Sequence, residues 1–402
     1  MAAIVEAIGL GALGLSMIPL AQDFFPAPYK ATTIVRVAAG MSMPGDSGAS
    51  TGGHTCGIGL FDGDGLRIGF KSGIRAGSIS DGTYMDIKVD PLDNNNNRPP
   101  EYLSIVGGGS DSLCVAYLAV TPPSSEYWAF YGDIPKQCGA YWYHSNLEVQ
   151  VQQGSYYPAC FWLTSPDPTT GKKPHPFPQG YGIHITDFTP SQDRATQYNT
   201  YPDTMCKSDP RYKAYDSVTE MNCLPVFNPP LIYGSNSVDP DFNALKTPGS
   251  FMCDPHADGT TMPSPEQVRQ LEQWTGGRFN EPTYGVKRSE APKKRQVKTR
   301  QSNLQNQACV DNHVVISSLD QHTATELCQS AASIGPDFVS TKENLYCDMC
   351  KHELWPVCST TITAACFDLS SNTVRAGMGV QGRDESSGRE VPSKSYNKVT
   401  NW

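Results

Sequence analysis

The sequence predicts a mainly β protein, with an antiparallel β-sandwich domain over residues 30–260 followed by a small disulfide-rich α+β domain. Short extended segments are repeatedly broken by turn residues, and the 402-residue chain contains 36 Gly and 32 Pro. Charged residues make up only 18%, so long solvated helices are not expected to dominate. Thirteen cysteines are spread over both halves of the chain. Short strands separated by frequent turns are typical of a sandwich.

The strands of the first domain are recognised by their side-chain patterns. Residues 32–37 are β-branched, and residues 84–89 alternate Tyr, Asp and Lys outward with Met, Ile and Val inward. Residues 57–60 and 66–70 flank Asp-Gly turn residues, which predicts a hairpin. Residues 113–120 are nearly all apolar, as in a strand covered on both faces. Further strands are expected at 142–143, 147–151, 161–164 and 181–188.

The end of the first domain has little periodicity. Residues 190–260 are rich in Pro, Asp, Asn and Tyr, which predicts long loops held by cysteines. A helix is expected at 264–276, because Ser264 and Pro265 provide an N-cap and a first-turn proline and Gly276 follows the last turn.

A basic linker is predicted at 277–307. Its core from 287 to 300 carries seven Lys or Arg against one acid, Glu290, and no apolar period. The segment is interpreted either as a solvated charged linker or as a site of proteolytic processing, since nicking concentrates in exposed polar loops. The dibasic processing candidates are Lys287, Arg288, Lys294 and Arg295.

The Cys-rich α+β domain is expected over residues 308–378. Residues 313–317 form a strand candidate, and Thr323 with Glu326 predicts the start of a helix. Residues 379–402 are interpreted as a polar, loosely held tail.

The cysteine count favours disulfide bonds formed in an oxidising compartment. The downstream six can close three disulfides, and the upstream seven leave one thiol over or one bridge to the other half. The disulfide candidates are Cys56, Cys114, Cys138, Cys160, Cys206, Cys223, Cys253, Cys309, Cys328, Cys347, Cys350, Cys358 and Cys366.

The first 21 residues are apolar apart from Glu6. Two interpretations stay open: a secretory signal peptide that is removed, or a retained Gly/Ala-rich helix that packs or inserts in a membrane. A basic residue normally begins a signal and is missing here, and no Asn-X-Ser/Thr sequon occurs in the chain, which argues mildly against the glycosylating pathway.

Charge and hydropathy argue against nucleic acid as a partner and against a stable membrane span. A net charge of −9 argues against a general nucleic-acid binder. No internal stretch of 18 apolar residues is present, so no stable membrane span is expected after processing.

A dense aromatic set is the leading candidate for a binding surface. Exposed rings could stack on sugar faces, whereas buried rings would fill the sandwich core. Alternation along residues 141–143 should place at least one ring outward. The predicted binding residues are Trp128, Tyr141, Trp142 and Tyr143.

Candidates for chemistry are weaker, and no catalytic residue, metal or cofactor is assigned. Gly45-Asp46-Ser47-Gly48 looks like a serine-protease segment, but no histidine precedes it. Cys347, Cys350 and His352 have zinc-like spacing, against which the disulfide interpretation is preferred. The acid–base candidates are His144, His184 and His256 with Asp133, Asp187 and Asp254.

Two stretches carry a resemblance. The first, in the β domain, consists of Leu113–Tyr117, 131–134 and 137–143. The second, in the Cys-rich domain, consists of 326–328, 335–340, 347–349, 356–358 and 366–369. They resemble an uncharacterised family of extracellular proteins from filamentous fungi. The resemblance implies a fungal source and export, and it carries no activity or site residues.

The sequence therefore predicts a secreted, non-enzymatic recognition protein that binds a cell-wall glycan or a host or competitor surface target. A secreted polysaccharide-active hydrolase is the first alternative. A membrane-active protein that uses residues 2–20 is the second. The oligomeric state does not follow from the sequence.

Overall fold

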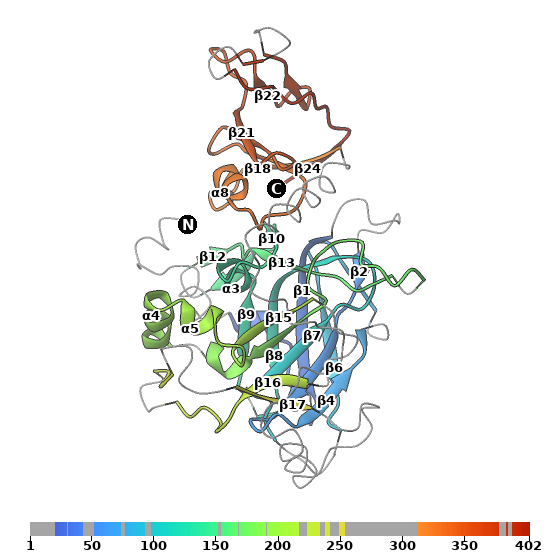
Figure 1. Cartoon of the computed structure of the whole chain (residues 1–402), viewed down its shortest axis with the longest axis vertical. Helices are drawn as coiled ribbons and strands as arrows, with labels where there is room; N and C mark the ends of the chain where they lie inside the picture. Colours follow the sequence, from blue (N-terminus) through green and yellow to red (C-terminus); the bar gives the residue numbers. More distant parts are fainter. Residues whose placement is uncertain are drawn as a thin grey trace, which may run out of the picture.

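The computed structural model describes residues 21–253 and 312–402, apart from positions 30, 43–51, 74–76, 93–97, 125, 152–153, 168, 190, 217–222, 234–237, 242–248, 378–382 and 385–387. A large β body comprises the first range, and a smaller domain comprises the second (Figure 1). The smaller domain lies at one end of the body, next to strand β10 (Trp142–Tyr143). The predicted segment 1–21 (except Ala21), the helix at 264–276 and the linker at 277–307 lie outside the described residues.

The first sheet of the body has six antiparallel strands in the order β10-β13-β8-β1-β6, with β9 also paired to β8. Strand β8 is buried along its whole length, as its continuous apolar sequence predicts. Strand β6 is at the edge and shows the predicted alternation of exposed and buried residues. The bounds are β1 Thr33–Ser42, β6 Tyr84–Val89, β8 Leu113–Thr121, β9 Trp128–Tyr131 and β13 Cys160–Leu163.

The second sheet has five antiparallel strands in the order β15-β14-β7-β3-β4. The predicted hairpin is confirmed, and Gly65 in its turn has a positive φ of 80°. The bounds are β3 Gly57–Phe61, β4 Arg67–Lys71, β7 Tyr102–Val106, β14 Gly180–His184 and β15 Tyr212–Tyr215.

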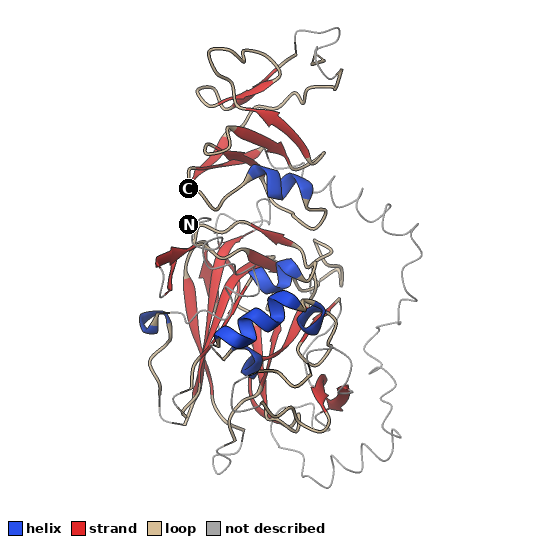
Figure 2. Ribbon diagram, turned by 90° about the vertical axis from the view of Figure 1, so that its left-hand side faces the viewer, coloured by secondary structure: helices blue, strands red, loops and turns tan. Residues whose placement is uncertain are grey.

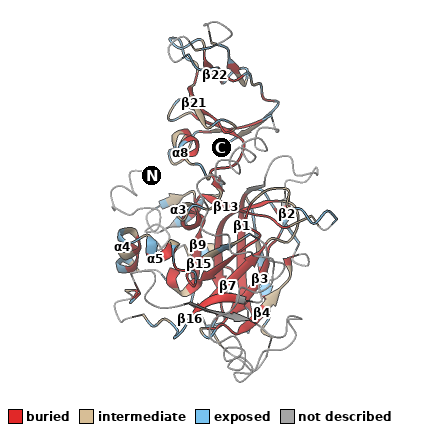
Figure 3. Ribbon diagram, viewed as in Figure 1, coloured by how far each residue is buried: buried red, intermediate tan, exposed pale blue. Residues whose placement is uncertain are grey.

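The two sheets share one hydrophobic core, so the mainly β fold class is confirmed. Inward side chains of the first sheet, such as Val35 and Leu118, belong to the same buried cluster as Ile58, Leu103 and Ile183 of the second. The inner strands are almost entirely buried (Figure 3). A core shared between two antiparallel sheets is compatible with the predicted sandwich.

Short helices cover one side of the body (Figure 2). The expectation of long loops over 190–260 is wrong in part, because two helices and three strands form there. Helix α4 begins after Ser191, whose side chain accepts a hydrogen bond from the backbone nitrogen of Arg194. Its polar sequence has almost no apolar period, which explains the missed prediction. The bounds are α3 Asp133–Gln137, η3 Ile185–Phe188, α4 Gln192–Thr200, α5 Asp203–Cys206, β16 Cys223–Phe227 and β17 Gly249–Cys253.

Smaller elements complete the body. Strand β16 pairs with β17, β2 (Gly52–His54) with β5 (Ser78–Ser80), and β11 (Val149–Val151) with β12 (Gly154–Tyr156). The short helix η1 (Gln22–Phe24) and Phe25 cover part of the outer face of the first sheet, where they pack with Tyr117 and Tyr131.

The C-terminal domain is built on a mixed sheet in the order β21-β20-β19-β18-β24, with helix α8 against it. Strand β18 is parallel to both β19 and β24, and the other pairs are antiparallel. The predicted strand and helix are confirmed, although Glu343 rather than Thr323 caps the helix. The bounds are β18 His313–Ser317, α8 Ala324–Gln329, β19 Asp337–Ser340, β20 Leu345–Asp348, β21 Glu353–Pro356, β22 Cys366–Asp368, β23 Thr373–Arg375 and β24 Lys398–Asn401.

The expectation of a loosely held tail at 379–402 is wrong for its described part from Val391 onward. Val391 and Tyr396 are buried in the core of the C-terminal domain, and β24 extends its sheet. The segment looked loose because it is polar in sequence. Its polar groups are instead paired inside the fold, with Lys394 bonded to Asp337 and Asp348.

Four disulfide bonds are described, and each lies within one domain. They are Cys114–Cys160, Cys138–Cys206, Cys328–Cys347 and Cys358–Cys366. Cys350 is also disulfide-bonded, and Cys56 is a free, buried thiol. The disulfide prediction is confirmed for these nine half-cystines and is wrong for Cys56, which is the free thiol among the described cysteines. Among the described residues, no helix is long and apolar enough to span a bilayer.

Candidate functional site

Three of the four predicted binding residues are buried. Trp128, Trp142 and Tyr143 are 3%, 2% and 0% exposed, and Tyr141 is half-buried against Phe177. The indole nitrogen of Trp128 donates a hydrogen bond to Thr189 Oγ1 at 3.1 Å, and its ring belongs to the sandwich core. A ring without an exposed face cannot stack on a sugar, so the prediction of a binding surface at these residues is wrong.

The physical reason lies in the second domain, which covers strand β10. Trp142 Nε1 donates to Ser330 Oγ at 2.9 Å, and Tyr143 OH donates to the carbonyl oxygen of Pro336 at 2.8 Å. The β10 backbone is paired to the same segment, because Ile334 N donates to the carbonyl of Trp142 at 3.0 Å. One buried cluster joins these rings to Phe338 and other core residues of the C-terminal domain. Trp142 and Tyr143 therefore connect the two domains, and we call this contact the domain joint.

Two of the exposed rings on the body lie near strand β6. Tyr84 on β6 is 53% exposed, and Tyr29, in the segment before β1, is 46% exposed. Alternation along the strand places Tyr84, Asp86 and Lys88 on the outward face of the sheet, while Ile87 and Val89 point into the core.

Tyr84 lies on a rigid polar base. The guanidinium carbon of Arg36 lies 3.8 Å from the ring centroid. Arg36 makes two hydrogen bonds with Asp86, from Nε to Oδ1 at 2.7 Å and from Nη2 to Oδ2 at 2.8 Å. Its Nη1 donates to the backbone carbonyl of Phe24 at 2.8 Å. The two parallel hydrogen bonds fix the plane of the guanidinium relative to the carboxylate. The guanidinium therefore supports one face of the Tyr84 ring, and the other face remains open.

The arrangement also accounts for the charge state of Arg36. Burial by itself would lower the pKa of this guanidinium, but the hydrogen bond and the charge of Asp86 outweigh it and raise the pKa. The direct register partners across the two strands are Arg36 and Asp86, so the pair follows from the strand alignment.

The ring of Tyr29 also contacts strand β6. Lys88 Nζ lies 4.3 Å from the ring centroid of Tyr29. Tyr84 and Lys88 are four residues apart on one strand face, which separates them by about 13 Å. We call the set of Tyr29, Arg36, Tyr84, Asp86 and Lys88 the β6 patch. It combines apolar ring faces with carboxylate and ammonium groups on a fixed sheet edge.

No family model matches the chain, and no curated protein matches it.

One predicted acid–base pair does come together, but inside the protein. His184 Nδ1 lies 3.1 Å from Asp187 Oδ2, and both side chains are fully buried. Arg211, also buried, bonds Asp187 Oδ1 at 2.9 Å and pairs with Asp239. Burial alone would raise the pKa of Asp187, but the charges of His184 and Arg211 lower it below its ordinary range. The cluster is a buried charge network, in which His184, Asp187 and Arg211 are at most 1% exposed.

The remaining candidates for acid–base chemistry, serine catalysis and zinc binding do not form a site among the described residues. His144 does not pair with a carboxylate but stacks on His322, while His256 and Asp254 lie outside the described residues, as does the segment 45–48. A zinc site is excluded at Cys347 and Cys350, because both sulfurs are in disulfide bonds.

Asp337, Asp348 and Cys350 bring potential ligand atoms within 4.8 Å of one another. The ammonium of Lys394 already lies between the carboxylates, and the sulfur of Cys350 is bonded. This cluster is therefore occupied by a cation that the chain itself provides.

Proposed function

We propose that the protein is an extracellular, non-enzymatic recognition protein that binds a cell-wall glycan through the β6 patch. The observation that carries the proposal is the ring of Tyr84, more than half exposed and fixed from below by Arg36. A recognition surface of this kind needs a ring that does not lose conformational freedom on binding. The Arg36–Asp86 pair provides that restraint.

The chemistry of the patch favours a carbohydrate as the ligand. A pyranose presents C–H groups on its face and hydroxyls at its rim. The open face of a tyrosine ring matches the C–H face, because aromatic rings bury large apolar areas. The carboxylate of Asp86, whose side chain is 36% exposed, can accept hydroxyl hydrogen bonds. The span from Tyr84 to Tyr29 favours an oligosaccharide over a single sugar.

The scaffold suits an exported protein. Several disulfides and the lack of a spanning helix among the described residues are compatible with an extracellular location. Secretion after removal of residues 1–21, a fungal source and processing of the basic linker belong to the proposal. They are supported by the apolar N-terminal sequence, the resemblance and the dibasic pairs.

The alternatives receive less support from the geometry. A glycosidase needs two carboxylates facing a cleft. Among the described residues, Asp187 with Asp239 and Asp337 with Asp348 are buried pairs that each share a cation, and Asp62 with Asp64 share Arg98 in the turn between β3 and β4. The membrane-active alternative depends on residues 2–20, which lie outside the described part of the chain.

The test is binding of the purified full chain to insoluble chitin, β-glucan and mannan. Tyr84→Ala should weaken binding about tenfold or more, since loss of a stacking ring costs on the order of 1–2 kcal/mol. Tyr201→Ala is the matched control, because Tyr201 is similarly exposed at 47% but lies after helix α4. Equal binding by Tyr84→Ala and wild type, or no binding to any of the polysaccharides, would overturn the proposal.

A further inference from the structure

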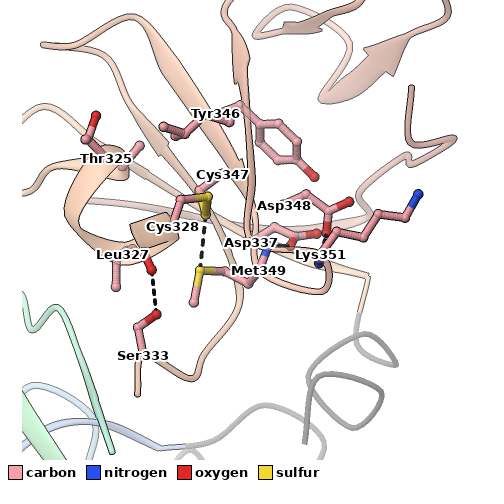
Figure 4. The surroundings of a disulfide bond; sticks show 12 residues. Thr325, Leu327, Cys328, Ser333, Asp337, Tyr346, Cys347, Asp348, Met349 and Lys351 are labelled. Atoms are coloured by element: carbon pink, nitrogen blue, oxygen red, sulfur yellow. Dashed lines mark hydrogen bonds between the residues drawn. A yellow bond between two sulfur atoms is a disulfide. The ribbon is translucent and has the colours of Figure 1, made fainter. Parts of the chain in front are cut away.

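Two carboxylates and one amine converge inside the C-terminal domain. Lys394 Nζ lies 2.7 Å from Asp337 Oδ2 and 2.6 Å from Asp348 Oδ1. The side chains are 20%, 8% and 0% exposed, respectively. Asp337 begins β19, Asp348 ends the neighbouring β20, and Lys394 comes from the segment before β24. Figure 4 shows the two aspartates side by side below the ring of Tyr346, to the right of the Cys328–Cys347 disulfide.

The cluster is not balanced in charge. One ammonium faces two carboxylates, and a buried excess negative charge is costly. Burial raises the pKa of Asp337, and repulsion from Asp348 adds to this rise while Lys394 opposes it. Attack requires the proton of the ammonium to move to Asp337, a step that leaves the net charge of the cluster unchanged and places it on Asp348. The transfer leaves a neutral amine next to a neutral carboxyl group.

The two oxygens of the Asp337 carboxyl group have different partners. The backbone N–H of Met349 donates to Oδ1 at 2.7 Å, as a donor to a developing oxyanion would. The other oxygen, Oδ2, accepts from the hydroxyl of Tyr396 and faces Lys394. The two oxygens are thus distinguished, with Oδ1 as the carbonyl oxygen and Oδ2 as the leaving oxygen.

Asp348 is placed as the proton carrier. Its Oδ1 faces Lys394 Nζ and is fixed by the backbone nitrogens of Cys350 at 2.9 Å and Lys351 at 3.3 Å. A carboxylate within hydrogen-bond reach of the attacking nitrogen can take its proton and return it to the leaving group.

We propose that Lys394 and Asp337 condense to an intramolecular isopeptide bond, with Asp348 as the general base and acid. The neutral Nζ attacks Cγ of protonated Asp337, and Asp348 moves a proton from nitrogen to Oδ2. A C–N bond forms, a C–O bond breaks and one water leaves, with no oxidant or reductant involved. Fixed proximity of the two groups replaces chemical activation.

The crosslink would join the chain end to the central part of the domain sheet. Strand β24 pairs with β18 alone, at the edge of the sheet. A bond between β19 and the segment before β24 closes a long loop and restricts the unfolded chain, as a disulfide does. Unlike a disulfide, it survives reductant.

The experiment is the intact mass of the full-length chain after denaturation and complete reduction. The wild type should be one water lighter than its sequence, and trypsin should not cleave after Lys394. Fragmentation should join the peptide that contains Lys394 to the peptide that contains Asp337. Asp348→Asn keeps both reacting groups but removes the proton carrier, so it should restore the full mass.

Two lysine variants complete the design. Lys394→Arg keeps the positive charge without an acylable amine and should restore the full mass. Lys342→Arg is the matched control, because Lys342 forms an exposed pair with Asp320 at 2.9 Å, and it should retain the loss of water. A wild-type chain at full mass, with free Lys394 recovered in the digest, would overturn the proposal even if every variant failed to fold.

Discussion

The imidazole rings of His144 and His322 stack across the domain joint, with centroids 4.7 Å apart and an interplanar angle of 21°. Both side chains are buried. His144 Nε2 contacts the carbonyl oxygen of Thr323 at 3.1 Å, and His322 Nδ1 contacts Ser317 Oγ at 2.9 Å. Two histidines from different domains therefore face each other where neither can be hydrated.

This pair should make the domain joint sensitive to acid. Burial lowers the pKa of His144 to about 3 and that of His322 to about 2, and Lys136 contributes to both shifts. Since both pKa values are below the unfolded value near 6.5, the unfolded state binds more protons as pH falls. Stability should be fully present above about pH 6.5 and be lost below it, by up to about 1.4 kcal/mol per pH unit for each ring.

The measurement is denaturant unfolding of the full chain from pH 7.5 to pH 4. His144→Phe keeps an aromatic ring in the stack and removes one titrating group, so its unfolding free energy should fall less steeply with pH. An unchanged slope in this variant would show that the stacked pair does not control the acid response.

Removal of the Trp142 ring should weaken the domain joint. Trp142→Ala deletes a buried indole and its hydrogen bond to Ser330, which should cost about 3–5 kcal/mol. Tyr201→Ala, at an exposed ring, should change stability by about 0.5 kcal/mol or less. Thermal unfolding should show one transition in the wild type and two in Trp142→Ala, as the domains uncouple. A single unshifted transition in the variant would contradict the role of the ring.

The predictions from sequence succeeded where local pattern determines structure. Alternation over Tyr84–Val89 and the apolar run of β8 gave the edge strand and the buried strand correctly. The same alternation pointed Tyr84 outward, so the signal for the β6 patch was present. It was not selected because the denser aromatic set near Trp142 attracted the binding hypothesis.

The failures concern contacts between distant parts of the chain. Tyr143 and Pro336 are 193 positions apart, and no local pattern shows that a second domain will cover β10. Lys394 and Tyr396 look like tail residues until Asp337, more than 50 positions upstream, is found beside them. Polar residues with a buried partner have the same sequence signature as solvated ones.

Cleavage of the basic linker should leave one complex of two chains. The domain joint combines apolar packing with several hydrogen bonds, among them Trp162 Nε1 to the carbonyl of Ile334 at 2.8 Å. A specific protease site placed between Arg288 and Lys294 allows controlled cutting. The two fragments should then elute together in gel filtration and separate in denaturant without reductant. Separate elution under native conditions would show that the joint depends on the covalent link.

Finally, the thirteen cysteines should contain one unreactive thiol and six disulfides. Burial raises the pKa of the Cys56 thiol to about 12, so almost none of it is thiolate at neutral pH. The eight half-cystines of the four described bridges and Cys350 are all disulfide-bonded. Alkylation without reductant should modify nothing in the native chain and Cys56 alone in denaturant. Two or more alkylated cysteines in denaturant would contradict this pairing, and non-reducing peptide mapping would show which bridge is missing.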